Sequence, residues 1–289
     1  MEYVKDAIEK ARLEREQKSL APEDSSEQPE NEQQREALQK TGGRAKADRK
    51  PAAKPATTEK HSEGIHVEYS QTRRVKVSNQ VLLDNRIVSA FESDHRAEPY
   101  RQLRTLVLKR FAEKNWRTLA ITSAHRHAGK TLTAVNLAIS LSKDMNQTIL
   151  LADMDLKGPN ILDALGVTVD KGLVEHLMQG VPLADILVNP GFDRLTVLPA
   201  TPVAGDTSEI LSSPAMKETL GELVNRYNDR LIVFDLPPLL ADDDALVFAP
   251  YVDATLLVVE SGVTTPEELK RCYQLLEGTP IIGTILNKV

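Results

Sequence analysis

Three short apolar runs, far apart in this 289-residue chain, each end in acidic or phosphate-binding residues. They are 118–123 followed by Ala124-His-Arg-His-Ala-Gly-Lys-Thr131, 148–152 followed by Asp153-Met-Asp-Leu-Lys-Gly-Pro159, and 231–234 followed by Asp235-Leu-Pro-Pro238. Apolar runs without polar alternation are typical of strands that are covered on both faces. Because such sheets bind ligands at the carboxyl ends of their strands, the three polar segments predict one shared site.

Strand-like and helix-like patterns alternate regularly after residue 114. The predicted strands span 118–123, 148–153, 195–200, 231–235, 254–260 and 281–286. The predicted helices span 99–114, 130–143, 172–179, 182–188, 214–227, 243–248 and 265–277. Two short edge strands are also predicted, at 65–69 and 74–77. This alternation predicts an α/β fold with a doubly wound, mostly parallel sheet and helices on both faces.

The N-terminal part of the chain differs in composition from the rest. Residues 2–16 predict a short amphipathic helix, which is either solvated or a docking helix for a partner. Residues 17–63 have almost no large apolar side chains, so burial cannot offset their ordering entropy, and they predict a disordered linker. The chain is therefore divided into residues 1–63 and a nucleotide-binding domain of residues 64–289.

Composition limits the partners and the compartment. The net charge of −6 gives no electrostatic case for nucleic-acid binding. The single cysteine, Cys272, permits no intrachain disulfide and suits a reducing cytoplasm. No apolar stretch approaches the roughly 20 residues of a membrane span. A cytoplasmic location is expected, with membrane association only through a partner or the N-terminal segment.

The segment after the first run fits the phosphate-loop pattern [AG]-x-x-x-x-G-K-[ST] and lies between a predicted strand and a predicted helix. Its backbone N–H groups and the helix N-terminus would face phosphates, while Lys130 would add a charge and Thr131 would bind Mg²⁺. The predicted nucleotide-binding residues are Ala124, His125, Arg126, His127, Ala128, Gly129, Lys130, Thr131 and Leu132.

Carboxylates follow the other two runs. Asp153 and Asp155 lie two residues apart, so one could approach a metal while the other faces an incoming hydroxyl. Asp235 ends the third run and is predicted to help hold Mg²⁺. The run 242–244 is interpreted as a solvated helix start with an N-cap.

Residues 65–289 resemble the bacterial tyrosine kinases of the polysaccharide-export type, within the deviant-Walker ATPases that include ParA and MinD. The family motif D-x-D-L-R-x-P is matched by Asp153-Met-Asp-Leu-Lys-Gly-Pro159, and D-x-P-P by Asp235-Leu-Pro-Pro238. The oligomerisation motif E-x-x-R-x-x-R is matched by Glu98, Arg101 and Arg104. The closing segment 283–288 resembles the one whose asparagine, here Asn287, contacts adenine.

The resemblance implies an ATP- and Mg²⁺-dependent protein tyrosine kinase that regulates exopolysaccharide assembly. Asp153 would be the base toward a tyrosine hydroxyl, and Thr131, Asp155 and Asp235 would position the metal. The oligomerisation motif would join neighbouring copies into a ring. The implied partner is the cytoplasmic tail of a membrane polysaccharide co-polymerase, which would recruit the protein to the inner face of the plasma membrane.

Two departures from the family pattern leave alternatives open. The family loop reads P-G-E-G-K, so His127 here stands where a glycine is usual and is expected to need an unusual backbone angle. Family members also carry a tyrosine cluster after the point where this chain reaches Val289. Of the six tyrosines, Tyr3 and Tyr69 are predicted to be accessible, while 227, 251 and 273 are interpreted as packing residues.

The alternatives are a catalytically degenerate scaffold of the same family and a ParA/MinD-like positioning ATPase. The altered loop favours the scaffold. The positioning ATPases carry a signature lysine where this chain has His125, which disfavours that function.

Overall fold

The computed structural model describes residues 72–226 and 229–289, which lie within a compact unit spanning Lys60–Val289. The predicted helix at 2–16, the predicted linker up to residue 63 and the predicted strand at 65–69 lie outside the described residues. Within the described ranges, no helix combines the length and the apolar character needed to cross a bilayer.

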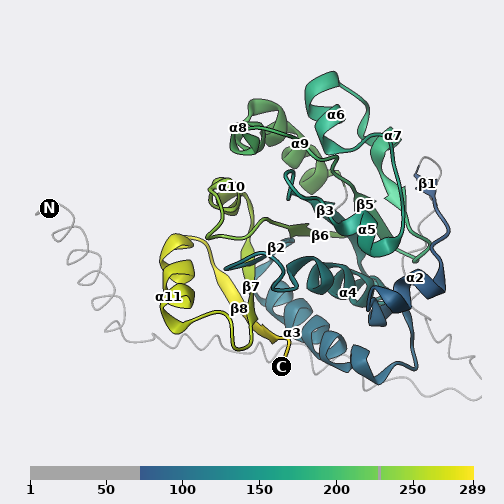
Figure 1. Ribbon diagram of the computed structural model, residues 1–289. Coiled ribbons are helices and arrows are strands. Elements are labelled where there is room, and N and C mark those ends of the chain that lie inside the picture. Colours follow the sequence, from purple (N-terminus) through teal and green to yellow (C-terminus); the bar gives the residue numbers. More distant parts are fainter. Residues whose placement is uncertain (1–71, 227–228) are drawn as a thin grey trace, which may run out of the picture. The chain divides into compact units, whose positions relative to one another are not determined.

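A single sheet runs through the described unit in the order β1-β4-β5-β3-β6-β2-β7-β8 (Figure 1). Its strands are β1 Arg73–Arg74, β2 Thr118–Ser123, β3 Thr148–Asp153, β4 Val188–Asn189, β5 Leu195–Leu198, β6 Arg230–Asp235, β7 Ala254–Glu260 and β8 Ile281–Asn287. Every neighbouring pair is parallel except β4 with β5. The predicted mostly parallel sheet is therefore confirmed.

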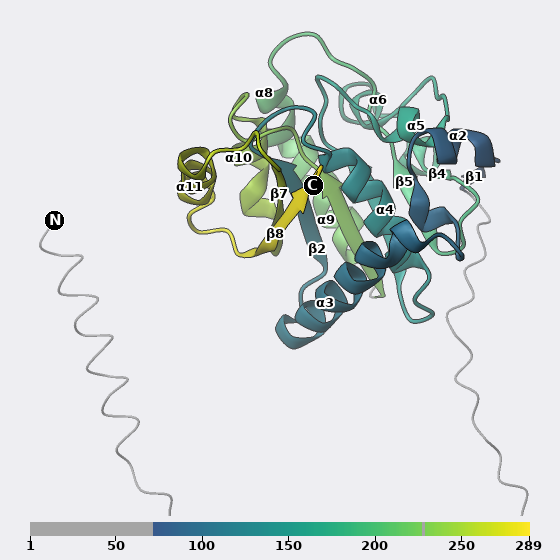
Figure 2. The ribbon, with the colours of Figure 1, turned by 60° about the horizontal axis from the view of Figure 1, so that its bottom comes forward.

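Helices cover both faces of this sheet. They are α2 Asn79–Asp84, α3 Glu98–Lys114, α4 Lys130–Ser142, α5 Ile161–Leu165, α6 Leu173–Gln179, α7 Leu183–Ile186, α8 Thr207–Ser212, α9 Pro214–Asn225, α10 Asp244–Phe248 and α11 Pro266–Leu275, with short 3₁₀ turns at Val88–Ala90, His95–Ala97 and Ala249–Tyr251. In Figure 2, α3 and α4 lie in front of the sheet and α9 lies behind it. The predicted doubly wound arrangement is confirmed.

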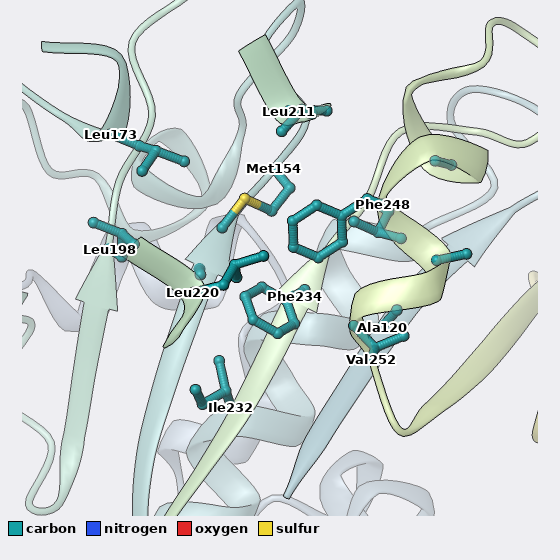
Figure 3. Packing of buried hydrophobic residues seen from close by; sticks show 14 of the residues in the cluster. Ala120, Met154, Leu173, Leu198, Leu211, Leu220, Ile232, Phe234, Phe248 and Val252 are labelled. Carbon is teal, nitrogen blue, oxygen red and sulfur yellow. The ribbon is translucent and has the colours of Figure 1, made fainter. Parts of the chain in front are cut away.

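Each central strand contributes side chains to two separate hydrophobic cores, because successive side chains of a strand point to opposite faces. In β2, Leu119 and Ile121 belong to the core under α3 and α4, whereas Ala120 belongs to the core on the other face. Figure 3 shows part of that second core, where Phe234 of β6 meets Phe248 of α10 with ring centroids 5.0 Å apart. Edge-to-face contacts of this kind add about 1 kcal/mol beyond the area that they bury.

This second core also places the acidic segment after β3. Met154 and Leu156 are fully buried in it, and they alternate with Asp153 and Asp155. Because the two apolar side chains hold the segment down, the two carboxylates stay at the carboxyl edge of the sheet.

Two predicted elements are corrected. The helix predicted at 182–188 ends at Ile186, because Val188 leaves it to pair with Val197 as β4. The edge strand predicted at 74–77 is the shorter β1, since its partner β4 is only two residues long. The short helices α2, α5 and α8 were not predicted.

Candidate functional site

The phosphate loop connects β2 to α4 and contains two left-handed residues. His127 has a φ of 65° and Gly129 a φ of 96°, so the unusual angle expected at His127 is confirmed. Histidine enters this region more readily than most residues with a side chain. Gly129 has a further constraint, because a Cβ there would collide with the amide of Asn287.

The loop side chains point in different directions. His125 turns away from the phosphate loop, and its Nε2 lies 3.0 Å from Glu268 Oε1, at the start of α11. Glu268 also accepts from the backbone N–H of Thr265 in a capping box. Arg126 and His127 instead line a cavity of about 270 Å³, together with Gly129, Lys130, Thr131, Leu132, Asp155, Gly158 and Asn160. Of the residues predicted to bind nucleotide, Arg126 lines this cavity and His125 does not.

Lys130 is the buried centre of the site. Its Nζ lies 2.8 Å from Asp155 Oδ2 and 3.6 Å from Asp235 Oδ1. Burial opposes the charged form of Lys130, but the neighbouring charges of Asp235 and Asp155 outweigh it and raise the pKa of the amine above its usual value. The three strand ends that the sequence predicts to converge do meet at this ammonium group.

Asp235 has the features of a metal-holding carboxylate. It is fully buried, and burial raises the pKa of its carboxyl group. Its Oδ2 accepts from the Thr131 hydroxyl at 2.6 Å, while its Oδ1 has no hydrogen-bond partner. A carboxylate oxygen without a hydrogen-bond donor, beside a hydroxyl, suits Mg²⁺, which binds few protein oxygens and completes its shell with water and phosphate. No cluster of three or more His, Cys, Asp or Glu side chains suited to a metal occurs among the described residues.

Asp153 lies at the end of β3 and is almost completely buried. Its Oδ2 accepts from the backbone N–H groups of Asn160 and Ile161, both at 3.0 Å, and its Oδ1 accepts from that of Asp155 at 3.2 Å. Burial, followed by the charge of Asp235, raises the pKa of this carboxyl group. Asp153 thus ties the start of α5 to the end of β3, and Oδ1 keeps a lone pair for a further proton donor.

The acidic run at 242–244 does start a helix, with an exposed Asp243 at the N-cap position of α10, but the predicted solvation of the whole run is wrong. Asp244 is fully buried, and the Thr207 hydroxyl donates to its Oδ2. Lys157 Nζ lies 3.4 Å from the same oxygen and 3.1 Å from Asp242 Oδ2. Sequence reasoning missed the role of Lys157, whose one signal was a basic residue at the arginine position of the D-x-D-L-R-x-P motif.

Asp244 gives the fold a pH dependence. Burial raises the pKa of its carboxyl group above the ordinary 3.8, with Asp242 adding to the shift and Thr207 and Lys157 opposing it. An acid with a raised folded-state pKa contributes stability that is complete below its unfolded pKa and is lost as pH rises through its folded pKa. We expect Asp244→Asn to lose less stability than the parent protein between about pH 4 and pH 7. Urea unfolding at several pH values in this range measures the free energy of unfolding of both proteins. If the two free energies changed in parallel with pH, the prediction would be contradicted.

Comparison with known proteins identifies the family. A family model named ParA, described as NUBPL iron-transfer P-loop NTPase, matches residues 115–273. The tyrosine-protein kinase YwqD of Bacillus subtilis is 30% identical over 193 residues, which cover 66% of this chain and 80% of YwqD. This chain belongs to the bacterial tyrosine kinase family, within the ParA-like P-loop NTPases. The predicted membership is therefore confirmed.

A solved structure of this tyrosine kinase family supports the same assignment. The kinase domain of the Escherichia coli tyrosine kinase ETK is 30% identical, with a TM-score of 0.65 over 76% of this chain and 84% of that domain. The chimerical protein CapA2B2 has the same TM-score at 24% identity, and it supports the fold alone. The etk protein of E. coli K12 is 32% identical, but this chain covers only 27% of it.

The family's oligomerisation motif lies at the start of α3 and makes contacts within one chain. Arg101 Nη1 lies 3.2 Å from Glu98 Oε2, and its Nη2 donates to the carbonyls of Glu92 and Asp94. Arg104 donates to the carbonyl of Ser140 at 3.0 Å. The role of these residues between subunits stays a prediction.

Asn287, at the end of β8, reaches the phosphate loop. Its Nδ2 donates to the carbonyl of Ala128 at 2.8 Å. The contact joins the edge strand to the nucleotide site, whereas the contact of Asn287 with adenine stays a prediction.

Proposed function

We propose that this chain is an ATP-dependent protein tyrosine kinase that phosphorylates copies of itself and regulates exopolysaccharide polymerisation and export. The observation that carries the proposal is the convergence of Lys130, Thr131, Asp155 and Asp235 at the phosphate loop. This convergence occurs in a chain whose relatives include the tyrosine-protein kinases YwqD and etk.

In this proposal the loop amides and Lys130 hold the ATP phosphates, and Asn287 lies beside the adenine. Thr131, Asp155 and Asp235 hold Mg²⁺, which when bound neutralises charge on the phosphate oxygens. The acceptor tyrosine oxygen attacks the terminal phosphorus, ADP leaves, and the hydroxyl proton passes to Asp153 Oδ1.

The assembly around the enzyme is also part of the proposal. Glu98 would leave its intrachain pair with Arg101 and join Arg101 and Arg104 of a neighbouring copy, so that one copy's tyrosines reach another's site. The cytoplasmic tail of a membrane polysaccharide co-polymerase would recruit the ring to the inner face of the plasma membrane. No nucleic acid is involved.

Two geometric observations weigh against the alternatives. A ParA/MinD-like ATPase needs a signature lysine, and the residue at that position, His125, pairs with Glu268 of its own chain. A scaffold with a damaged loop would not need the buried pair of Lys130 with Asp155. The first observation disfavours a positioning ATPase, and the second favours a loop that still binds nucleotide.

Among the described tyrosines, Tyr273 is the expected acceptor. It is 44% exposed on α11, which corrects its interpretation as a packing residue. Tyr100 is half-buried, with its pKa raised by burial and its hydroxyl bonded to Thr133, and Tyr251 packs with its ring centroid 6.0 Å from that of Phe248. Tyr3, Tyr69 and Tyr227 lie outside the described residues.

Phosphopeptide mass spectrometry after incubation with Mg-ATP tests the proposal. We expect the parent protein to carry phosphotyrosine at Tyr273 and the Lys130→Ala variant to carry none. Tyr273→Phe should lose the Tyr273 phosphopeptide and no other. Phosphate confined to other tyrosines would overturn the choice of Tyr273. Absence of phosphotyrosine from protein supplied with the partner tail would overturn the kinase function.

A further inference from the structure

A partly buried charge cluster lies next to the nucleotide site and takes no part in the proposed chemistry. Lys157 follows β3, whereas Asp242, 85 residues further along the chain, and Asp244 follow β6. The side chain of Lys157 is 29% exposed, that of Asp242 16% and that of Asp244 1%. Lys157 therefore bridges the two segments that lead away from the site's aspartates.

The turn that carries Asp155 is held at several points. Asp153 Oδ2 accepts from the start of α5, and the backbone N–H of Gly158 donates to Asp155 Oδ1 at 3.2 Å. On the other side, the carbonyl of Leu156 accepts from the N–H of Val203 at 2.9 Å. Lys157 supplies a side-chain anchor from this turn to the segment that follows Asp235.

We propose that Lys157 is a positioning residue that sets the distance between Asp155 and Asp235 on either side of Lys130. Direct pairing of β3 with β6 fixes Asp153 opposite Asp235, and the N–H of Met154 donates to the Asp235 carbonyl at 2.9 Å. Asp155 lies beyond this pairing, so its distance from Asp235 also depends on how the turn after β3 is held to the segment after β6. Lys157 joins these segments through Asp242 and Asp244. The inference rests on the proposed function, because this spacing matters for the binding of Mg-ATP.

The cluster's charge balance decides how the inference must be tested. One lysine serves two carboxylates, and Asp242 Oδ1 and Asp244 Oδ1 already lack hydrogen-bond partners. Removing Lys157 alone would leave two largely buried carboxylates without a cation, which destabilises a fold strongly. A loss of activity in Lys157→Met would therefore mix misfolding with mispositioning.

A neutral triple variant separates the two effects. Lys157→Met with Asp242→Asn and Asp244→Asn removes the cation together with the charges that it balances. Lys157→Arg keeps the bridge. Arg110→Met is the matched control, because it removes a cation from an exposed pair with Glu113 on α3.

Three measurements are made on each full-length variant. They are the urea midpoint of unfolding, the dissociation constant of ATP with and without Mg²⁺ by calorimetry, and the rate of phosphotransfer. The ratio of the two dissociation constants reports how well the carboxylates hold Mg²⁺, and it does not require phosphotransfer. If the cluster only stabilised the fold, removing it would change the urea midpoint without changing this ratio.

We expect the triple variant to keep an unfolding midpoint near that of the parent protein while its Mg²⁺-dependent gain in ATP affinity falls about tenfold. Losses of this size are typical when groups that orient metal ligands are removed. Lys157→Arg and Arg110→Met should keep the gain. The inference would be overturned if the triple variant kept the parent's Mg²⁺-dependent gain in ATP affinity. It would also be overturned if Lys157→Arg lost that gain together with the triple variant. A parent protein that shows the gain without phosphotransfer would overturn the kinase function alone.

Discussion

Lys130→Ala is expected to weaken ATP binding at least about a hundredfold and to abolish phosphotransfer, because truncating one partner of a buried charge pair costs several kcal/mol. The ammonium group is the one cation within 4 Å of both Asp155 and Asp235 among the described residues. Without it, phosphates would enter a site that holds two uncompensated carboxylates. Calorimetric titration with Mg-ATP measures the loss.

The control for this variant lies on the same helix. Lys143→Ala removes an exposed lysine at the C-terminal end of α4, opposite the phosphate loop. The Lys143→Ala variant should bind ATP as tightly as the parent protein does. Because loss of Lys130 also leaves buried carboxylates unpaired, urea unfolding must show that the alanine variant is folded before its binding is interpreted. Parental ATP affinity in folded Lys130→Ala would contradict the assignment of this loop as the phosphate site.

Asp153→Asn is expected to slow phosphotransfer about 10²- to 10⁴-fold, the usual contribution of a general base. An amide keeps one acceptor oxygen for the N–H groups of Asn160 and Ile161, but it cannot take the tyrosine proton. ATP binding should change little, because the hydrogen bonds of Asp153 go to backbone N–H groups at the end of β3 and the start of α5 rather than to the phosphate loop. Single-turnover phosphotransfer at saturating Mg-ATP isolates the effect.

Asp163→Asn is the matched control for this second prediction. Asp163 is an exposed aspartate on α5, the same helix whose start Asp153 holds. The Asp163→Asn variant should transfer phosphate at the parental rate. If Asp153→Asn lowered ATP affinity and the transfer rate by the same factor, Asp153 would serve only to hold the end of β3 against α5.

Much of the fold could be predicted from the sequence because its signals are local. The strands β2, β3 and β7 begin and end where their apolar runs do. The glycine before Lys130 and the helix that starts at Lys130 mark the phosphate loop without reference to any other part of the chain. The rule that parallel strands present ligands at their carboxyl ends then brings Lys130, Asp155 and Asp235 together.

The side-chain environments around these groups could not be predicted in the same way. Three consecutive aspartates read as a solvated run, yet Asp244 is buried because α10 packs beside α8 and brings it to Thr207 and Lys157. His125 reads as a phosphate ligand, yet it faces α11 and pairs with Glu268. Tyr273 lies in an amphipathic helix near the buried Cys272, and only the packing of α11 leaves it exposed.

The sequence by itself determined the strand and helix pattern, the phosphate loop and the set of acidic groups at the sheet edge. Each of these depends on neighbours within one element or on the fixed geometry of a parallel sheet. The tertiary structure alone decided which of the charged groups are buried and which pair with one another. Burial and pairing depend on contacts between elements far apart in the chain, such as the contact of Thr131 with Asp235 across 104 residues. A local pattern of residues does not specify which distant residues come into contact.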